Sequence, residues 1–137
     1  MDCIDIEKEA EWLLTAAPIA QLTGKEFQKS NINLVAQVTD FFANIKEVNR
    51  REIGTVFLEK RGIRSSIAHG ISRNKAIAFA AVPEIIKTGV IINQETNYKN
   101  RGYDNSVIAA PISIGGEVFI AEVIVNQYND GINKFYC

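Results

Sequence analysis

The stretch that decides the fold is a pair of β-rich runs, SVIAAPISI at residues 106–114 and EVFIAEVIV at residues 117–125, joined by Gly115-Gly116. A Gly-Gly pair between two such runs is a strong signal for a two-residue hairpin turn. Both runs are almost continuously apolar, so we expect the hairpin to be central in a sheet and covered on at least one face. Pro111 predicts a bulge or an unpaired position, because proline cannot donate a ladder hydrogen bond.

Weaker signals surround this hairpin. Short β-rich runs predict strands at residues 51–59, at residues 90–92 and from Lys134 onward. Apolar residues at helical spacing, with Pro, Gly and capping residues at the ends, predict the helices. These lie at residues 6–17, after the capping box of residues 23–26, at 34–45, 63–69, 74–81 and 84–87.

Helices that precede an antiparallel sheet indicate an α+β fold. We therefore expect N-terminal helices packed on a four- to five-stranded antiparallel sheet. Residues 1–137 form a single domain in this interpretation, with a helical part at 1–48 and a part at 49–137 that combines a strand, helices and the sheet. The abrupt end at Cys137 predicts a domain taken from a longer protein.

Composition narrows the class of protein. Of 137 residues, 47% are hydrophobic and 23% charged, which is typical of a globular domain. The longest apolar run, residues 76–82, is too short to cross a bilayer, and the acidic N-terminus lacks the features of a signal peptide. The two cysteines, at positions 3 and 137, do not form a disulfide framework. We expect a cytoplasmic protein without a membrane partner.

Positive charge is concentrated in the middle of the chain. Residues 50–75 carry seven Lys or Arg and two Asp or Glu, a net charge of +5, whereas the whole chain has −1. Such a strip attracts a polyanion such as RNA. A solvated surface loop explains the same charges, and the overall acidic pI of about 5.9 argues against strong nonspecific RNA binding.

The basic strip contains the only histidine, His69, which can act as an acid or base near neutral pH. RNA cleavage through the ribose 2′-hydroxyl needs such a group, together with cations and hydroxyls that hold the phosphate. The candidates for holding it are Arg64, Lys75, Arg101, Ser65 and Ser66. The alternative is that His69 only caps the carbonyl groups at the end of a helix.

A second polar stretch supplies Lys99, Arg101 and Tyr103. If it folds beside His69, it adds cations and an aromatic ring on which a base can stack. The alternative is a solvated hairpin loop. The sequence contains neither a Gly-x-Ser-x-Gly motif, nor a glycine-rich phosphate loop, nor a His/Cys zinc spacing, so we expect neither a metal nor a cofactor.

Four motifs resemble a family of domains found in large polyvalent proteins of phages and conjugative elements. They are GIRSSIAHG at residues 62–70, PEIIKTG at 83–89, AAPISIGG at 109–116 and Phe135-Tyr136, and the resemblance covers roughly residues 22–137. It implies a compact ribonuclease fold of the barnase/EndoU/colicin/RelE group. It also implies metal-independent, toxin-like RNA cleavage in a polyprotein injected with mobile DNA.

Carried over residue by residue, the resemblance matches Arg64, Ser66, His69 and Lys99. In the family the Phe-Tyr pair leads into a polar His-Glu-like pair, whereas this chain stops at Cys137, which puts the completeness of the site in doubt. The partners implied are RNA and immunity or neighbouring polyprotein domains.

Three hypotheses about function follow. In the first, the domain is a ribonuclease: His69 is the acid or base, Arg64, Lys75 and Lys99 hold the phosphate, and Ser66 positions it. In the second, the same basic strip is a non-catalytic module that binds nucleic acid or protein. In the third, the domain is a structural module without a site.

Overall fold

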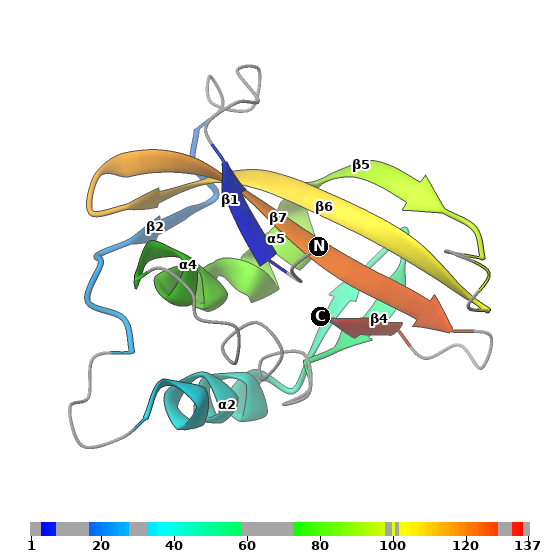
Figure 1. Cartoon of the computed structure of the whole chain (residues 1–137), viewed down its shortest axis with the longest axis horizontal. Helices are drawn as coiled ribbons and strands as arrows, with labels where there is room; N and C mark the ends of the chain where they lie inside the picture. Colours follow the sequence, from blue (N-terminus) through cyan, green and yellow to red (C-terminus); the bar gives the residue numbers. More distant parts are fainter. Residues whose placement is uncertain are drawn as a thin grey trace.

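The structure is a computed structural model of the chain. It describes residues 4–7, 17–27, 33–58, 73–97, 100, 102–128 and 133–135. Within these residues, an eight-stranded mixed sheet packs against three α-helices and one 3₁₀ helix (Figure 1). The predicted combination of helices and sheet in one fold is confirmed, but the sheet has eight strands rather than the four or five expected.

The elements have the following bounds. The strands are β1 (Ile4–Glu7), β2 (Ala20–Leu22), β3 (Glu47–Arg50), β4 (Gly54–Phe57), β5 (Val90–Glu95), β6 (Tyr103–Ile114), β7 (Glu117–Tyr128) and β8 (Asn133–Phe135). The helices are α2 (Leu34–Ile45), α4 (Arg73–Ala78), the 3₁₀ helix η1 (Phe79–Ala81) and α5 (Val82–Thr88).

The predicted hairpin is the centre of the sheet. Strands β6 and β7 pair without interruption from Ile114↔Glu117 at the turn to Tyr103↔Tyr128 at the far end. Gly115 and Gly116 have φ angles of +57° and +85°, the positive values that a type I′ turn requires and that glycine adopts without strain. The middle of the hairpin is buried on both faces, which confirms its central position.

Each long strand has two further neighbours, one along each half of its length. The outer edge of β6 pairs with β2 near the turn and with β5 toward the far end. The outer edge of β7 pairs with β1 near the turn and with β8 toward the far end. Beyond β8 the sheet continues through β4 to β3.

The expectation of a purely antiparallel sheet was wrong. β2 runs parallel to β6, and β4 runs parallel to β8. Both pairs join segments that are more than 70 residues apart. Parallel neighbours need a crossover connection and cannot be joined by a tight turn. Local turn signals reveal antiparallel hairpins but carry no information about these distant pairings.

Pro111 corrects another expectation. It forms no bulge but stays in register with Ile120, between the stretch of β6 that pairs with β5 and the stretch that pairs with β2. Bonded and non-bonded pairs alternate outward from the turn, and Pro111 lies in a non-bonded pair with Ile120. The backbone groups of Pro111 therefore point away from β7. Its carbonyl accepts a hydrogen bond from the amide of Ile19 at 2.9 Å. The missing N–H therefore costs the central ladder nothing.

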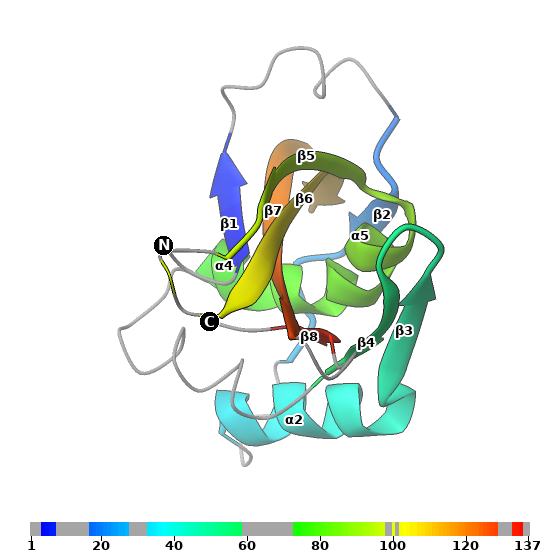
Figure 2. The ribbon, with the colours of Figure 1, turned by 90° about the vertical axis from the view of Figure 1, so that its right-hand side faces the viewer.

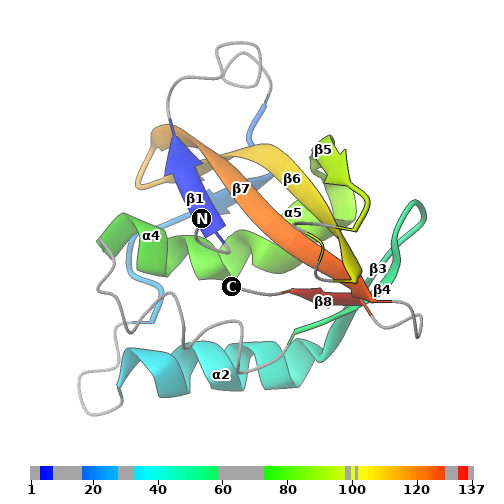
Figure 3. The same cartoon turned by 45° about the vertical axis from the view of Figure 1, so that its right-hand side comes forward.

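The helices form a layer on one face of the hairpin, with α4, η1 and α5 between β6–β7 and α2 (Figure 3). The Asn33 side chain caps α2 by accepting from the amide of Ala36 at 2.8 Å. As predicted, α2 turns one apolar face inward: Val38 and Phe42 are buried, and Phe42 contacts Phe79 of η1 with ring centroids 6.3 Å apart.

Helix α5 ends where the sequence predicts, at Gly89. A Cβ atom at this position would lie 2.5 Å from the carbonyl oxygen of Ile85 and 2.7 Å from Cγ2 of Ile108. The Arg50 side chain donates to the carbonyls of Ile86 and Gly89. Gly89 therefore lets the end of α5 lie close to β6, and Arg50 joins the same end to β3.

The N-terminal part differs from the prediction. Residues 4–7 form strand β1 on the edge of β7, so the helix predicted at residues 6–17 does not begin at Ile6. The 1–48 part also contains β2 and the start of β3, and is therefore not purely helical. The amide of Thr23 donates to Oε2 of Glu26 at 2.9 Å, as in a capping box, but the Thr23 hydroxyl accepts from the amide of Lys25 at 3.1 Å, and residues 24–27 do not form a helix. Residues 63–69, predicted as a helix, lie outside the described residues.

Candidate functional site

Most of the residues predicted for the site lie outside the described part of the chain. These are Arg64, Ser65, Ser66, His69, Lys99 and Arg101. The backbone of Lys75 lies in α4, and its side chain is not among those described. The convergence of these groups on one phosphate therefore stays a prediction. Of the predicted site residues, Tyr103 is the one whose surroundings the structure describes.

Tyr103 lies at the first position of β6, directly opposite Tyr128, the last residue of β7. The two ring centroids are 5.2 Å apart with an angle of 48° between the planes. This is a tilted contact within the usual range for aromatic pairs. Both residues are half-buried. The pair forms the aromatic end of the hairpin.

An amide pair lies two residues further along both strands. Asn105 and Asn126 are opposite each other, 7% and 2% exposed, and Nδ2 of Asn105 donates to Oδ1 of Asn126 at 3.0 Å. Because side chains alternate along a strand, this pair lies on the same face as the two tyrosines. That face is the one turned away from the helices, since Ile108 and Val125 on the other face belong to the hydrophobic core. We call Tyr103, Asn105, Asn126 and Tyr128 the hairpin end.

The loop that leads into the hairpin end is tied down by its own side chains. The amide of Asn97 donates to Oδ1 of Asp104 at 2.9 Å, and the amide of Gly102 donates to Oδ1 of Asn97 at 2.9 Å. These bonds join Asn97, two residues after β5, to Gly102 and Asp104 at the start of β6. Residues 99 and 101 lie in the sequence between the linked positions, so two cationic residues lie within four positions of Tyr103.

The opposite face of the same sheet region is also polar. The hydroxyl of Ser106, which is fully buried, donates to Oε1 of Gln127 at 2.9 Å. The buried side chain of Asn133 donates to the carbonyls of Ile53 and Thr55 at 3.1 and 3.0 Å. Both groups therefore have partners inside the protein: the Ser106 bond joins β6 to β7, and the Asn133 bonds join β8 to β4 and to the turn before it.

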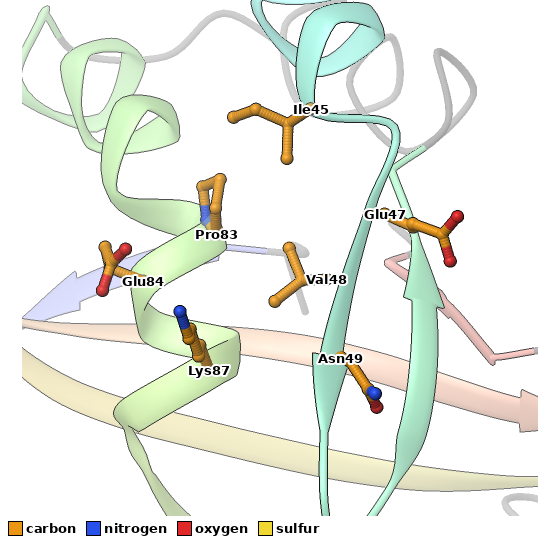
Figure 4. A pocket seen from close by; sticks show the side chains of 7 residues that line it. All are labelled: Ile45, Glu47, Val48, Asn49, Pro83, Glu84 and Lys87. Carbon is orange, nitrogen blue, oxygen red and sulfur yellow. The ribbon is translucent and has the colours of Figure 1, made fainter.

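A separate groove of about 400 Å³ lies between the end of α2, strand β3 and helix α5 (Figure 4). Its lining residues are Ile45, Glu47, Val48, Asn49, Pro83, Glu84 and Lys87. Val48 points toward α5, whereas Glu47 and Asn49 point to the other side of β3. The floor is apolar and the rim carries charges of both signs, which suits a side chain of a partner better than a phosphate.

Glu26 and Glu52 have shifted pKa values. Burial raises the pKa of Glu26, but hydrogen bonds from the backbone of Thr23 and Gly24 outweigh it, so the pKa lies below the ordinary value of 4.5. A hydrogen bond from Arg50 lowers the pKa of the exposed Glu52. Neither group lies at the hairpin end, and within the described residues no cluster of His, Cys, Asp or Glu could hold a metal ion.

The polar residues 93–105 were interpreted as one long loop, but residues 93–95 belong to β5 and residues 103–105 to β6, and Tyr128 and the amide pair were missed. A signal for them exists: counting equally outward from the Gly115-Gly116 turn places Tyr103 opposite Tyr128 and Asn105 opposite Asn126. The groove had no such signal, because it joins three elements from residues 45 to 87 that meet only in the folded chain. None of the helices in the described part of the chain has the length and hydrophobicity needed to cross a membrane.

Comparison with known proteins gives one match. The family model of large polyvalent protein-associated domain 3 matches residues 20–136. No curated protein and no solved structure matches the chain. The resemblance to polyvalent-protein domains is therefore confirmed, whereas the nuclease fold implied by that resemblance stays a prediction.

Proposed function

Because the chain belongs to the large polyvalent protein-associated domain 3 family, we propose that it is a module of a larger polyvalent protein that binds single-stranded RNA at the hairpin end. The observation that carries this proposal is the contact between Tyr103 and Tyr128, two half-buried rings at the end of the longest strands. Aromatic side chains on a sheet are the common surface on which proteins stack unpaired bases.

The amide pair supports the same proposal. Asn105 and Asn126 bond to each other and are buried, so they brace the strand positions next to the tyrosines. A surface held by such bonds loses little conformational freedom when a ligand binds, which favours affinity. The amide pair thus stabilises the part of the hairpin that carries Tyr103 and Tyr128.

Positive charge near the tyrosines would supply the second component of RNA binding. Lys99 and Arg101 precede Tyr103 closely in the sequence, and Asn97 and Asp104, which lie before and after them, are joined by a hydrogen bond. Contacts between cations and phosphates provide affinity that falls as salt rises, whereas stacking on aromatic rings depends on salt far less. The two contributions are therefore separable by experiment.

A sharper form of the proposal is that the module also cleaves the RNA it binds. His69 would act as the acid or base, Arg64, Lys75 and Lys99 would hold the phosphate, and Ser65 and Ser66 would donate hydrogen bonds to it. The single histidine amid serines and cations supports this form. The chain would act inside the cell that receives the polyvalent protein, with RNA as its substrate and an immunity or neighbouring domain as its regulator.

The experiment is a binding titration followed by fluorescence anisotropy, with a fluorescein-labelled single-stranded RNA of twelve mixed-sequence nucleotides. Stacking on one aromatic ring contributes about 1–3 kcal/mol per base, so Tyr128→Ala should weaken binding about tenfold or more. Tyr128→Phe keeps the ring and serves as the matched control, with affinity close to that of the wild type. Equal affinities for all three proteins, each shown to be folded by circular dichroism, would overturn the proposal.

Cleavage is tested separately, on the same RNA, by gel electrophoresis after incubation in EDTA. If the module is a ribonuclease, His69→Ala abolishes cleavage while the affinity measured by anisotropy stays within about twofold, because the histidine acts on the reacting atoms rather than on the stacked bases. Binding without cleavage by the wild type would remove the catalytic form and leave the binding module.

A further inference from the structure

Strand β3 is the end of the sheet. In the strand order β3 follows β4, and no strand in the described part of the chain pairs with its other side (Figure 2). The side chains of Glu47 and Asn49 are exposed. An exposed strand edge presents unpaired N–H and C=O groups, which are a template for another extended chain.

The direction of these backbone groups follows from the register. The amide of Leu58 donates to the carbonyl of Lys46 at 3.0 Å, just beyond the Glu47↔Phe57 pair. Bonded and non-bonded pairs alternate along an antiparallel ladder, so Val48 and Arg50 bond toward β4. The N–H and C=O groups of Glu47 and Asn49 therefore point outward from the sheet.

The groove lies beside this edge. Val48 turns its side chain to α5 and forms part of the apolar floor with Ile45 and Pro83 (Figure 4). A residue placed directly opposite Val48 on an added strand would point to the same face, and hence toward the groove. A volume of about 400 Å³ is large enough for an aromatic or a large aliphatic side chain.

We propose that β3 and the groove bind an extended segment of a partner protein, which adds to the sheet as an antiparallel strand. The segment places a large apolar residue opposite Val48 and a Lys or Arg opposite Glu47. Main-chain hydrogen bonds to Glu47 and Asn49 provide affinity, and the groove and the carboxylate provide specificity. This site is separate from the hairpin end and does not depend on RNA binding.

The negative charge of Glu47 favours a basic residue at the opposite position of the added strand. This carboxylate is exposed and points away from α5, to the face on which the opposed residue of the added strand also lies. Opposite charges at directly paired positions are stabilising, and like charges are destabilising. In an antiparallel segment read from its N-terminus, the order is thus polar, apolar, basic, for the residues opposite Asn49, Val48 and Glu47.

The structure also distinguishes β3 from β5, another strand with one partner in the sheet. Strand β5 has a register shift between Ile91 and Asn93, and such a bulge hinders the addition of a strand. The register between β3 and β4 has no shift, and Arg50 fixes the end of β3 to the carbonyls of Ile86 and Gly89. The groove is therefore held in place before any partner arrives.

The probe is the synthetic peptide acetyl-Thr-Ser-Thr-Phe-Lys-Thr-Ser-amide, titrated into the ¹⁵N-labelled chain and followed by NMR. We expect the amide signals of Glu47, Val48 and Asn49 to shift with one dissociation constant. A twin peptide with Glu in place of Lys should bind about three- to tenfold more weakly, and a twin with Ala in place of Phe at least tenfold more weakly.

Three variants test the geometry. Asn49→Pro removes an N–H that points outward and does not bond to β4, so the fold is retained while binding falls about tenfold; Asn49→Ala keeps the N–H and is the matched control. Glu47→Lys should reverse the preference, so that the Glu peptide binds more tightly than the Lys peptide.

The proposal is overturned if the amide signals of residues 47–49 do not move at millimolar peptide. It is also overturned if Asn49→Pro and Asn49→Ala bind equally well, or if Glu47→Lys keeps the preference for the Lys peptide. Light scattering measures whether the chain alone forms a dimer. A dimer that Asn49→Pro converts to a monomer would mean that a second copy of the chain, not a segment of another protein, binds the edge of β3, and would overturn the proposal.

Discussion

Asn105 and Asn126 share a hydrogen bond of 3.0 Å across the two central strands, next to the Tyr103–Tyr128 ring contact. Both amides are buried, where a polar group without a partner is costly. The pair therefore fixes the register at the point where the hairpin stops being covered by apolar residues. The proposed RNA surface rests on this bond.

We expect the effect of replacing Asn126 on stability to depend on whether Asn105 is still present. Asn126→Ala leaves Nδ2 of Asn105 without its acceptor and should lower the free energy of unfolding by about 1–3 kcal/mol. The double variant Asn105→Ala/Asn126→Ala should lose less than the sum of the two single variants, because the unpaired group is gone. Urea denaturation measures both. Asn93→Ala, at an exposed position of β5, is the control, with a change within about 0.5 kcal/mol.

Arg50 predicts a second, independent effect on stability. Its side chain is 12% exposed and donates to two carbonyls at the end of α5, where a cation is favoured by the helix dipole. Arg50→Ala should reduce the free energy of unfolding by about 1–3 kcal/mol, whereas Arg51→Ala, at an exposed neighbour, should be almost neutral. If both variants unfold at the same urea concentration, Arg50 does not hold α5 to β3.

The same variant has an electrostatic signature. Because the hydrogen bond from Arg50 is the main cause of the low pKa of Glu52, Arg50→Ala should bring that pKa back toward 4.5. An NMR titration of the Glu52 side chain measures it, with Arg51→Ala as the comparison. A pKa that stays low in Arg50→Ala would show that the ion pair is not its cause.

Gly89 is predicted to tolerate no side chain. A methyl group there would meet the carbonyl of Ile85 at 2.5 Å and Cγ2 of Ile108 at 2.7 Å, so α5 must move away from β6. Overpacking of this kind costs about 1–3 kcal/mol, and we expect Gly89→Ala to unfold earlier by that amount in urea. Lys87→Ala, an exposed change in the same helix, should leave the midpoint unchanged.

Glu26 predicts a dependence on pH. Its pKa is lower in the folded chain than the ordinary value of 4.5, so its stabilising effect is complete above 4.5 and is lost as the pH falls through the lower, folded value. Glu26→Gln should therefore be less stable than the wild type at pH 7, and the difference should shrink in that acid range. A difference that stays constant between pH 7 and pH 3 would contradict this assignment. Thermal unfolding at several pH values provides the measurement.

The sequence was most informative where one segment determines its own structure. The Gly115-Gly116 turn defines the hairpin, Asn33 and the apolar positions of α2 define that helix, and Gly89 ends α5. In each case the deciding interactions lie within a few residues of one another, so propensity and pattern are sufficient.

Pairings over long distances were beyond such patterns. β1 was interpreted as the start of a helix because Ile6 fits an apolar helical stripe, yet those residues extend along β7. β3 reads EVNR, which has no alternation that marks a strand, and forms because β4 and α5 lie beside it. Tertiary contacts outweigh local propensity at both places.

The candidate site was predictable only in part. Tyr103 was identified as an aromatic residue beside cations, but its partner Tyr128 follows from the register and not from any local motif. The groove between residues 45 and 87 depends on how α2, β3 and α5 come together. The roles of His69 and its neighbours remain a prediction from the residue types alone.

The most direct measurement of the central claim is a photo-crosslink between the chain and a single-stranded RNA that contains 4-thiouridine, with the crosslinked peptide identified by mass spectrometry. If RNA stacks at the hairpin end, the crosslinks fall on Tyr103 or Tyr128 and disappear in the variant Tyr103→Ala/Tyr128→Ala. Crosslinks that leave both tyrosines untouched and persist in that variant would contradict the account.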